Sequence, residues 1–216
     1  MEKGIVNASL IILAGGLSRR FGCNKCLKLL SGKPLIFHIL DRVYGLCSEM
    51  FVVISHLEMK PIFENVVHER AKVLIDDYYG IGPLAGIRRG VEEAHEKFVL
   101  VLAGDLPFVS KDALSFMLRE TKEGGFHALI PRWPNGFIEP LHAIYHRDAL
   151  KEAVKRSVAN GKLKVSDAIS GIRKVRFLEV EELRRFDPEL LTFFNINTLE
   201  DYMRATEILG CRSVSR

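Results

Sequence analysis

The sequence predicts an α/β fold, in which a mostly parallel sheet lies between two layers of helices. Short apolar runs alternate along the chain with longer amphipathic segments, and that order favours a three-layer α/β/α architecture. The apolar runs are nearly continuous, which is typical of strands covered on both faces. From about residue 127 the pattern changes, and it predicts a β-hairpin or antiparallel excursion in the second half.

In the first half of the chain, short apolar runs predict strands with helices between them. The strands are expected over residues 9–14, 51–54, 72–75 and 98–103. Apolar residues spaced as one helix face predict a helix over 34–49, and its proline lies near the start, where helices tolerate proline. Further helices are expected over 83–95 and 111–122, with Ser110 as the N-cap of the latter.

In the second half, strands over 127–132 and 139–145 flank the turn sequence Pro-Asn-Gly, which is typical of a hairpin. The remaining expected elements are a helix over 147–158, a strand over 175–180 and a helix over 198–209. No internal repeat, low-complexity tract or linker interrupts the sequence. A single domain over residues 1–216 is therefore expected, built on a Rossmann-like sheet.

Composition limits the function classes. With 48% hydrophobic and 27% charged residues, the chain can bury a substantial core. It has no apolar run near the roughly 18 residues of a membrane helix and no recognisable cleavable signal, so a cytoplasmic protein that does not associate with membranes is expected. The formal charge of +4 is too small to imply a nucleic-acid partner.

The glycine-rich loop after the first strand is a candidate phosphate-binding site. In doubly wound sheets, ligands bind beyond the carboxyl ends of the strands, where this loop is expected. Gly15 and Gly16 let backbone amides approach a ligand closely, while Arg20 and Lys25 supply a bidentate donor and a point charge for phosphate oxygens. Neither GxxxxGK[ST] nor GxGxxG occurs in the sequence, so a tight structural turn stays open as the alternative.

The same loop contains a CxxC motif, formed by Cys23 and Cys26. A structural zinc site usually takes four ligands, and no second Cys/His pair with suitable spacing is present. A redox role is compatible with a CxxC at the start of a helix. Two small buried cysteines on either side of Lys25 are the preferred interpretation.

A second candidate site element is the acid that ends the 98–103 strand. Asp105 follows Gly104 at the carboxyl end of that strand, so it is expected in the same crevice as the glycine-rich loop. Mg²⁺ bound through one or two carboxylates is the usual way to balance polyphosphate charge; an N-cap or turn acid is the structural alternative. Asp76 and Asp77 also follow a strand, and their residue types alone leave nucleotide, metal and solvent open.

Several motifs together resemble a known family. The first set is LAGGLSRRFG at 13–22, Lys25, GKPL at 32–35 and GDLP at 104–107, which resembles nucleotidyltransferases of the sugar-nucleotide type. The second set is GPLAGI at 82–87, EPLHAIY at 139–145 and NINT at 195–198. In this order the two sets resemble the molybdenum cofactor guanylyltransferases, the molybdopterin-guanine dinucleotide biosynthesis protein A family. The resemblance covers roughly residues 8 to 205.

The resemblance implies a role for each matching residue. The residues implied to bind the nucleotide are Leu13, Ala14, Gly15, Gly16, Arg20, Lys25, Ser55, Asp76 and Asp105. Asp105 would bind Mg²⁺, and Arg20, Lys25 and Asp105 would form the catalytic set. Asn195 and Asn197 would face the pterin acceptor. Ser55 stands where members of the family often have asparagine.

The activity implied is transfer of GMP from GTP to the terminal phosphate of molybdopterin, with release of pyrophosphate and Mg²⁺ as cofactor. The nucleotide-binding half would span about 8–110 and the acceptor-binding half about 111–209. The resemblance also implies protein partners that insert or receive the cofactor. The alternatives are a nucleotidyltransferase for another nucleotide such as CTP, or for another phosphorylated acceptor, and a nucleotide-binding regulatory subunit.

Overall fold

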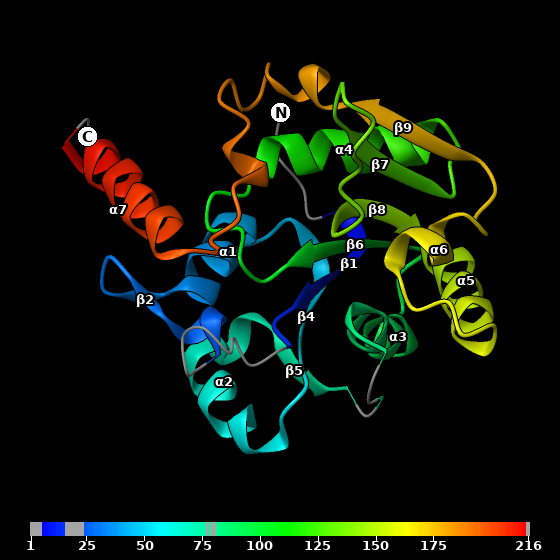
Figure 1. Cartoon of the computed structure of the whole chain (residues 1–216), viewed down its shortest axis with the longest axis horizontal. Helices are drawn as coiled ribbons and strands as arrows, with labels where there is room; N and C mark the ends of the chain where they lie inside the picture. The colour runs from blue at the N-terminus through cyan, green and yellow to red at the C-terminus, as the bar shows by residue number, and fades with distance from the viewer. Residues whose placement is uncertain (1–5, 16–23, 77, 79–80, 215–216) are drawn as a thin grey trace.

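The computed structural model describes residues 6–15, 24–76, 78 and 81–214, and Figure 1 shows a central sheet with helices on both faces. Within these ranges the main sheet has seven strands in the order β5-β4-β1-β6-β8-β7-β9. The strands are β1 (Val6–Leu13), β4 (Cys47–Ile54), β5 (Lys72–Ile75), β6 (Phe98–Ala103), β7 (Ala128–Arg132), β8 (His142–His146) and β9 (Val175–Glu179). A separate small hairpin pairs β2 (Leu29–Leu30) with β3 (Lys33–Pro34).

The sheet is parallel except at one strand. β8 runs antiparallel to β6 and to β7, whereas the other neighbouring pairs are parallel. This confirms the antiparallel excursion predicted for the second half. Because β8 runs backwards, it begins at the edge of the sheet where β6 and β7 end, so the segment that joins β7 to β8 lies at the carboxyl edge.

Two apolar clusters fill the spaces between the sheet and its helical layers. The helices are α1 (Leu35–Val43), α2 (Lys60–Val67), α3 (Pro83–Glu93), α4 (Lys111–Glu123), α5 (Arg147–Ala159), α6 (Val165–Ile169) and α7 (Leu199–Val214). α1, α2 and α4 pack on one face, and α3, α5 and α6 on the other. α7 adds Ala205 to the first cluster and projects from the body in Figure 1. None of the helices in the described ranges meets the length and hydrophobicity needed to cross a bilayer.

β1 lies at the centre of both clusters. Along this strand Leu10 and Ile12 enter one cluster while Ile11 enters the other, as the two-residue period of a strand requires. α3 approaches β1 closely because two of its residues lack side chains. A Cβ on Gly90 would lie 2.6 Å from Ile11, and one on Gly86 would lie 2.8 Å from Leu13. The glycine inside GPLAGI thus has a packing role.

The sequence prediction differs from the structure at three helices, one of which was predicted too long. The helix expected over 34–49 ends at Val43, and β4 already begins at Cys47. Gly45 has a φ of +67°, a conformation that glycine adopts readily and that ends the helix. The first part of β4 is polar because it lies at the amino edge of the sheet. The short helices α2 and α6 were not predicted.

Candidate active site

The loops after the parallel strands meet at the carboxyl edge of the sheet. The backbone N–H of Gly104, after β6, donates to the carbonyl of Leu13 at 2.9 Å, and that of Ala14 donates to the carbonyl of Val53 on β4 at 2.8 Å. These bonds continue the sheet ladder by one residue. A side chain on Gly104 would collide, since its Cβ would lie 2.7 Å from the carbonyl oxygen of Leu13.

Three predicted site residues from distant parts of the sequence form one cluster at this edge. Lys25 Nζ lies 2.7 Å from Asp105 Oδ2 and 3.0 Å from Asn197 Oδ1. The side chains of Lys25 and Asp105 are 18% and 20% exposed, so the ion pair is accessible to a ligand yet largely shielded from water. The cluster brings one residue each of the nucleotide, metal and acceptor groups into contact.

Asn24 fixes the backbone that carries Lys25. It is 3% exposed, and its side chain bridges two segments. Asn24 Nδ2 donates to the carbonyl of Ala14 at 2.9 Å, while Oδ1 accepts from the N–H of Cys26 at 2.9 Å. The second bond caps the 3₁₀ helix Lys25–Leu27. Asn24 was not among the predicted site residues, although an asparagine before a short turn is a usable N-cap signal.

Asp105 has the features of a metal ligand. Its backbone carbonyl accepts from the N–H of Ile196 at 3.1 Å, which ties it to the segment that contains Asn195 and Asn197. Its side-chain Oδ2 pairs with Lys25, but Oδ1 is buried, and no described residue donates a hydrogen bond to it. A buried carboxylate oxygen without a donor suits a hard cation. No cluster of three or more His, Cys, Asp or Glu side chains that could hold a metal ion occurs in the described ranges.

Asn197 is positioned by the start of α7. The hydroxyl of Thr198 accepts from the N–H of Asp201 at 3.1 Å, and the carboxylate of Asp201 accepts from the N–H groups of Thr198 and Asn197 at 2.8 and 2.9 Å. This reciprocal pair is a capping box. The N–H of Asn197 is the main cause that holds the pKa of Asp201 below its ordinary value. The cap therefore holds Asn197 in place beside Lys25.

Ser55 and Asp76 meet on the other side of β1. Ser55 Oγ donates to Asp76 Oδ2 at 2.8 Å, and Asp76 is only 8% exposed. Gly15 lies against this pair, because a Cβ built on it would be 2.5 Å from Ser55 Oγ. Leu13, Ala14, Gly15, Ser55 and Asp76, which the sequence grouped around a nucleotide, thus lie at the ends of the neighbouring strands β1, β4 and β5.

Other predicted residues lie apart from the cluster or outside the described residues. The side chain of Asn195 donates to the carbonyl of Phe193 at 3.3 Å, whereas Lys25 bonds to Asp105 and Asn197 instead. Gly16, Arg20, Cys23 and Asp77 lie outside the described residues.

Cys26 is part of the packing beneath the site. Its thiol is buried and donates to the carbonyl of Gly104 at 3.2 Å. Burial, followed by the negative charge of Asp105, raises the pKa of Cys26 to about 12. The thiol therefore stays protonated at neutral pH, which is unfavourable for a metal thiolate or a redox nucleophile.

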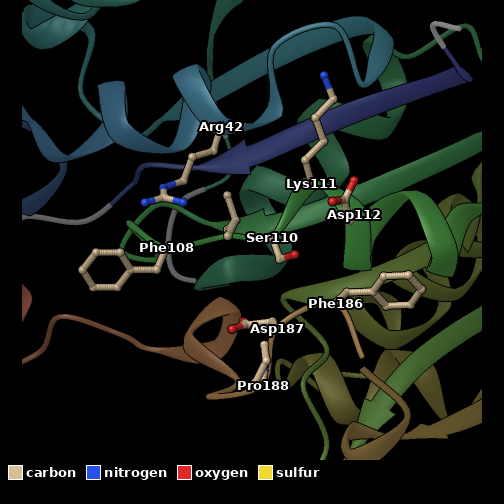
Figure 2. A pocket seen from close by; sticks show the side chains of 9 residues that line it. Arg42, Phe108, Ser110, Lys111, Asp112, Phe186, Asp187 and Pro188 are labelled. Carbon is tan, nitrogen blue, oxygen red and sulfur yellow. The ribbon is translucent and has the colours of Figure 1, made fainter. Parts of the chain in front are cut away.

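A cavity of about 290 Å³ lies elsewhere, between the end of α1, the start of α4 and residues 186–188 (Figure 2). Its lining combines the cations Arg42 and Lys111 with the acids Asp112 and Asp187. None of the predicted site residues lines it. The charges of opposite sign give it no clear preference for an anion.

Comparison with known proteins agrees with this geometry. Residues 10–172 match the family described as MobA-like NTP transferase domain. The probable molybdenum cofactor guanylyltransferases of Methanosarcina mazei and Pyrococcus horikoshii are 35% and 36% identical, over 89% and 88% of this chain and 87% and 94% of theirs. The crystal structure of molybdopterin-guanine dinucleotide biosynthesis protein A from Archaeoglobus fulgidus superposes with a TM-score of 0.80 at 32% identity, covering 94% of this chain and 98% of that one.

The fold and these matches define the class: the chain is a nucleotidyltransferase. A 4-diphosphocytidyl-2C-methyl-D-erythritol synthase from Anaerococcus prevotii, with a TM-score of 0.70 at 13% identity, shares the fold alone. Within the class, the chain belongs to the MobA-like NTP transferase family.

Proposed function

We propose that the protein transfers GMP from GTP to the terminal phosphate of molybdopterin, forming the guanine dinucleotide cofactor and releasing pyrophosphate. The observation that carries the proposal is the cluster of Lys25, Asp105 and Asn197 at the carboxyl edge of the sheet. The names of the relatives, probable molybdenum cofactor guanylyltransferases, support the choice of both substrates.

The nucleotide is assigned to the ends of β1, β4 and β5. Backbone groups of Leu13, Ala14 and Gly15 would hold the nucleoside, with the hydrogen-bonded pair of Ser55 and Asp76 beside it. A Cβ on Gly15 would collide with Ser55 Oγ, so the glycine lets this pair lie directly against the backbone of the loop. Gly16, Arg20 and Lys25 are proposed to contact the phosphates.

The reaction is an in-line displacement at the α-phosphorus of GTP. An oxygen of the acceptor phosphate forms the new P–O bond, and the bond between the α-phosphorus and the bridging oxygen breaks, so pyrophosphate leaves with the electron pair. A phosphate monoester has its second pKa at about 6, so the nucleophile is already largely ionised at neutral pH. The protein needs no general base for this step.

Catalysis then rests on positioning and on charge. The barrier comes from bringing two anions together and from charge that develops on the leaving pyrophosphate. Lys25 is held by Asp105 and Asn197 from opposite halves of the chain, so its charge is oriented before the substrates bind. Preorganised charge of this kind stabilises the transition state without reorganisation during the reaction, and holding both substrates reduces the entropic cost.

We infer that a divalent metal, Mg²⁺, binds at Asp105 through the buried Oδ1, to which no described residue donates a hydrogen bond. When bound, it would neutralise polyphosphate charge. Asn195 and Asn197 are proposed to face the pterin acceptor. The tie between Asp105 and Ile196, which lies between these two asparagines, supports that placement.

The decisive experiment is a pyrophosphate-release assay of the purified protein. GTP, CTP, ATP and UTP are each tested with and without molybdopterin and Mg²⁺. We expect release that requires GTP, molybdopterin and metal together. Turnover with CTP but not GTP would replace the nucleotide assignment, and release that is independent of molybdopterin would remove the acceptor assignment.

A further inference from the structure

Resting on the proposed function, we propose that Glu139 determines specificity for the pterin ring of the acceptor by accepting hydrogen bonds from its ring N–H and exocyclic amino group. Glu139 lies in the segment that joins β7 to β8, on the far side of β6 from the residues assigned to the nucleotide. None of the site residues inferred from the sequence lies in this segment.

The segment is continuous with the acceptor side of the site. The carbonyl of Leu141 accepts from the N–H of Ala103 at 2.8 Å, two residues before Asp105. Trp133 packs its ring edge-on against Phe193 with centroids 5.5 Å apart, and the carbonyl of Phe193 accepts from Asn195. Trp133 and Glu139 therefore lie next to the stretch that contributes Asn195 and Asn197.

The carboxyl group of Glu139 is held rigidly but only partly used. Its Oε1 accepts from Trp133 Nε1 at 2.8 Å, and its backbone N–H donates to the carbonyl of Pro131 at 2.9 Å. No described residue donates to Oε2. The neighbouring cation Arg132 pairs with Glu179 instead. Burial raises the pKa of Glu139. A half-buried acid without a cation is costly, and such groups cluster at functional sites.

The chemistry of this arrangement fits an aminopyrimidinone edge. A pterin presents a ring N–H and an amino N–H side by side, at a spacing that matches the two oxygens of one carboxylate. Oε2 is available to one donor, and Oε1 retains a second lone pair beside the indole bond. Guanine carries the same edge, but the residues assigned to the nucleotide lie beyond β6, at the ends of β1, β4 and β5, so the acceptor is the assigned source.

The test uses Trp133, which is the single tryptophan of the chain. Its emission is titrated with 6-hydroxymethylpterin and with 6-hydroxymethyllumazine, in which a carbonyl replaces the amino group; free tryptophan amide corrects for absorption by the probes. The wild-type protein should bind the pterin about 10- to 100-fold more tightly, the range expected for a hydrogen bond to a charged group. Equal affinity for the two probes would overturn the proposal without any variant.

The variant Glu139→Gln separates recognition from structure. The glutamine oxygen can still accept from Trp133, while its amide now donates toward the ligand. We expect the pterin preference to vanish or reverse and the KM for molybdopterin to rise about tenfold or more, with an unchanged KM for GTP and an unchanged Tm. A raised KM for GTP alone would assign Glu139 to guanine and overturn the proposal, as would a retained pterin preference.

Glu179→Gln is the matched control, because it removes a neighbouring carboxylate that pairs with Arg132. It should leave the preference for the pterin probe unaltered. If Glu179→Gln lost this preference as fully as Glu139→Gln, the change in net charge would explain the effect and the proposal would be overturned. The titration contains no nucleotide and no turnover. Turnover of molybdopterin without a pterin preference would reject only this inference, whereas a preference without turnover would reject only the proposed function.

Discussion

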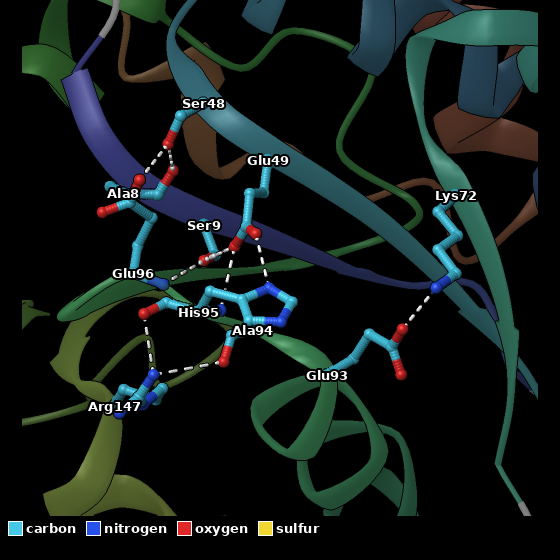
Figure 3. Close-up of polar contacts among 10 residues, drawn as sticks. All are labelled: Ala8, Ser9, Ser48, Glu49, Lys72, Glu93, Ala94, His95, Glu96 and Arg147. Atoms are coloured by element: carbon cyan, nitrogen blue, oxygen red, sulfur yellow. Dashed lines mark hydrogen bonds and ion pairs between the residues drawn. The ribbon is translucent and has the colours of Figure 1, made fainter.

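The two edges of the sheet differ in how completely their polar side chains are hydrogen-bonded. At the amino edge, Ser9, Glu49 and His95 form a closed network in which both oxygens of the carboxylate are used (Figure 3). At the carboxyl edge, the carboxylate of Asp105 uses one oxygen for Lys25 and leaves the other buried without a described donor. Both are acids at strand ends, yet only the second keeps capacity for a ligand.

The amino-edge network extends across several elements. Ser48 Oγ donates to the carbonyl of Ala8 at 3.2 Å and to Glu96 at 2.7 Å. Arg147, at the start of α5, donates to the carbonyls of Ala94 and His95, as Figure 3 shows. Polar groups with all their hydrogen bonds made stabilise a fold. A buried polar group without a partner destabilises it and is typical of a binding site. The comparison predicts that variants at the carboxyl edge change activity and those at the amino edge change stability.

The largest expected effect follows from Asp105→Asn. The substitution removes the charge that would attract a divalent cation and keeps an oxygen for Lys25. We expect kcat/KM to fall about 10²- to 10³-fold and the metal titration of activity to shift to higher concentration. Pyrophosphate release across a Mg²⁺ series measures both, with Asp41→Asn, in a surface ion pair with Arg70, as the control. An unchanged metal titration would refute the metal assignment.

Lys25→Ala should be nearly as severe. The ammonium group of Lys25 bonds to both Asp105 and Asn197. Its loss removes a preorganised positive charge from the active site, so we expect a turnover rate about 10²-fold lower. Unfolding should stay cooperative. Steady-state kinetics and thermal melts are compared with Lys60→Ala, whose ammonium group lies in a surface pair with Glu64. A normal rate in Lys25→Ala would exclude this residue from the site.

Asn24→Ala should affect both properties at once. It leaves the carbonyl of Ala14 and the N–H of Cys26 without their bridge, at a cost of about 1–3 kcal/mol of unfolding free energy. Activity should fall because Lys25 is no longer held. Urea unfolding and turnover are the measurements. Asn160→Ala, which removes an exposed side chain at the end of α5, should change neither, and full activity in Asn24→Ala would show that the bridge does not position Lys25.

The sequence placed Asp105 in the same crevice as the loop that carries Lys25 for a simple reason. The carboxyl ends of parallel strands meet at one edge, so residues that follow two such strands converge whatever their separation along the chain. The strands over 72–75 and 98–103 coincide with β5 and β6 for a similar reason, since buried apolar runs have clear limits.

Other features depend on partners that a local pattern does not contain. The polar start of β4 was predicted to be helical. Its Glu49 is stabilised in the strand by hydrogen bonds with Ser9 and His95, each more than 35 residues away along the chain, and a local pattern does not contain these partners. The role inferred for Glu139 depends on which of its oxygens Trp133 occupies. Hydrogen-bond capacity left over after folding is a property of the packed structure.

Glu49→Gln tests the amino edge through its pH dependence. Burial alone would raise the pKa of Glu49, but hydrogen bonds from Ser9 and His95 to the ionised form outweigh it and lower the pKa. Because the folded-state pKa lies below the unfolded-state value, the carboxylate stabilises the fold above the unfolded-state pKa, and this contribution is lost as the pH falls through the folded-state pKa.

The variant should therefore lose about 1–2 kcal/mol at neutral pH, and the difference from wild type should shrink as the pH falls below the ordinary glutamate pKa of 4.5. Urea unfolding over this range measures it, and turnover should not change. Glu58→Gln provides the control, since Glu58 pairs with His56 in an exposed position. A difference from wild type that is constant with pH would contradict the linkage.

The smallest effect is expected at the cysteines. Burial raises the pKa of both Cys26 and Cys47 to about 12, so neither should react with a thiol reagent in the native protein, whereas Cys211 is exposed. In a Cys23→Ser background, a disulfide reagent at neutral pH should modify Cys211 rapidly and the two buried thiols only on unfolding. The double variant Cys23→Ser/Cys26→Ser should keep its rate within about threefold, because a serine hydroxyl can still donate to the carbonyl of Gly104. A loss of rate comparable to that of Lys25→Ala would instead give the CxxC motif a chemical role at the carboxyl edge. A thiol would then belong to the ligand-binding groups of that edge.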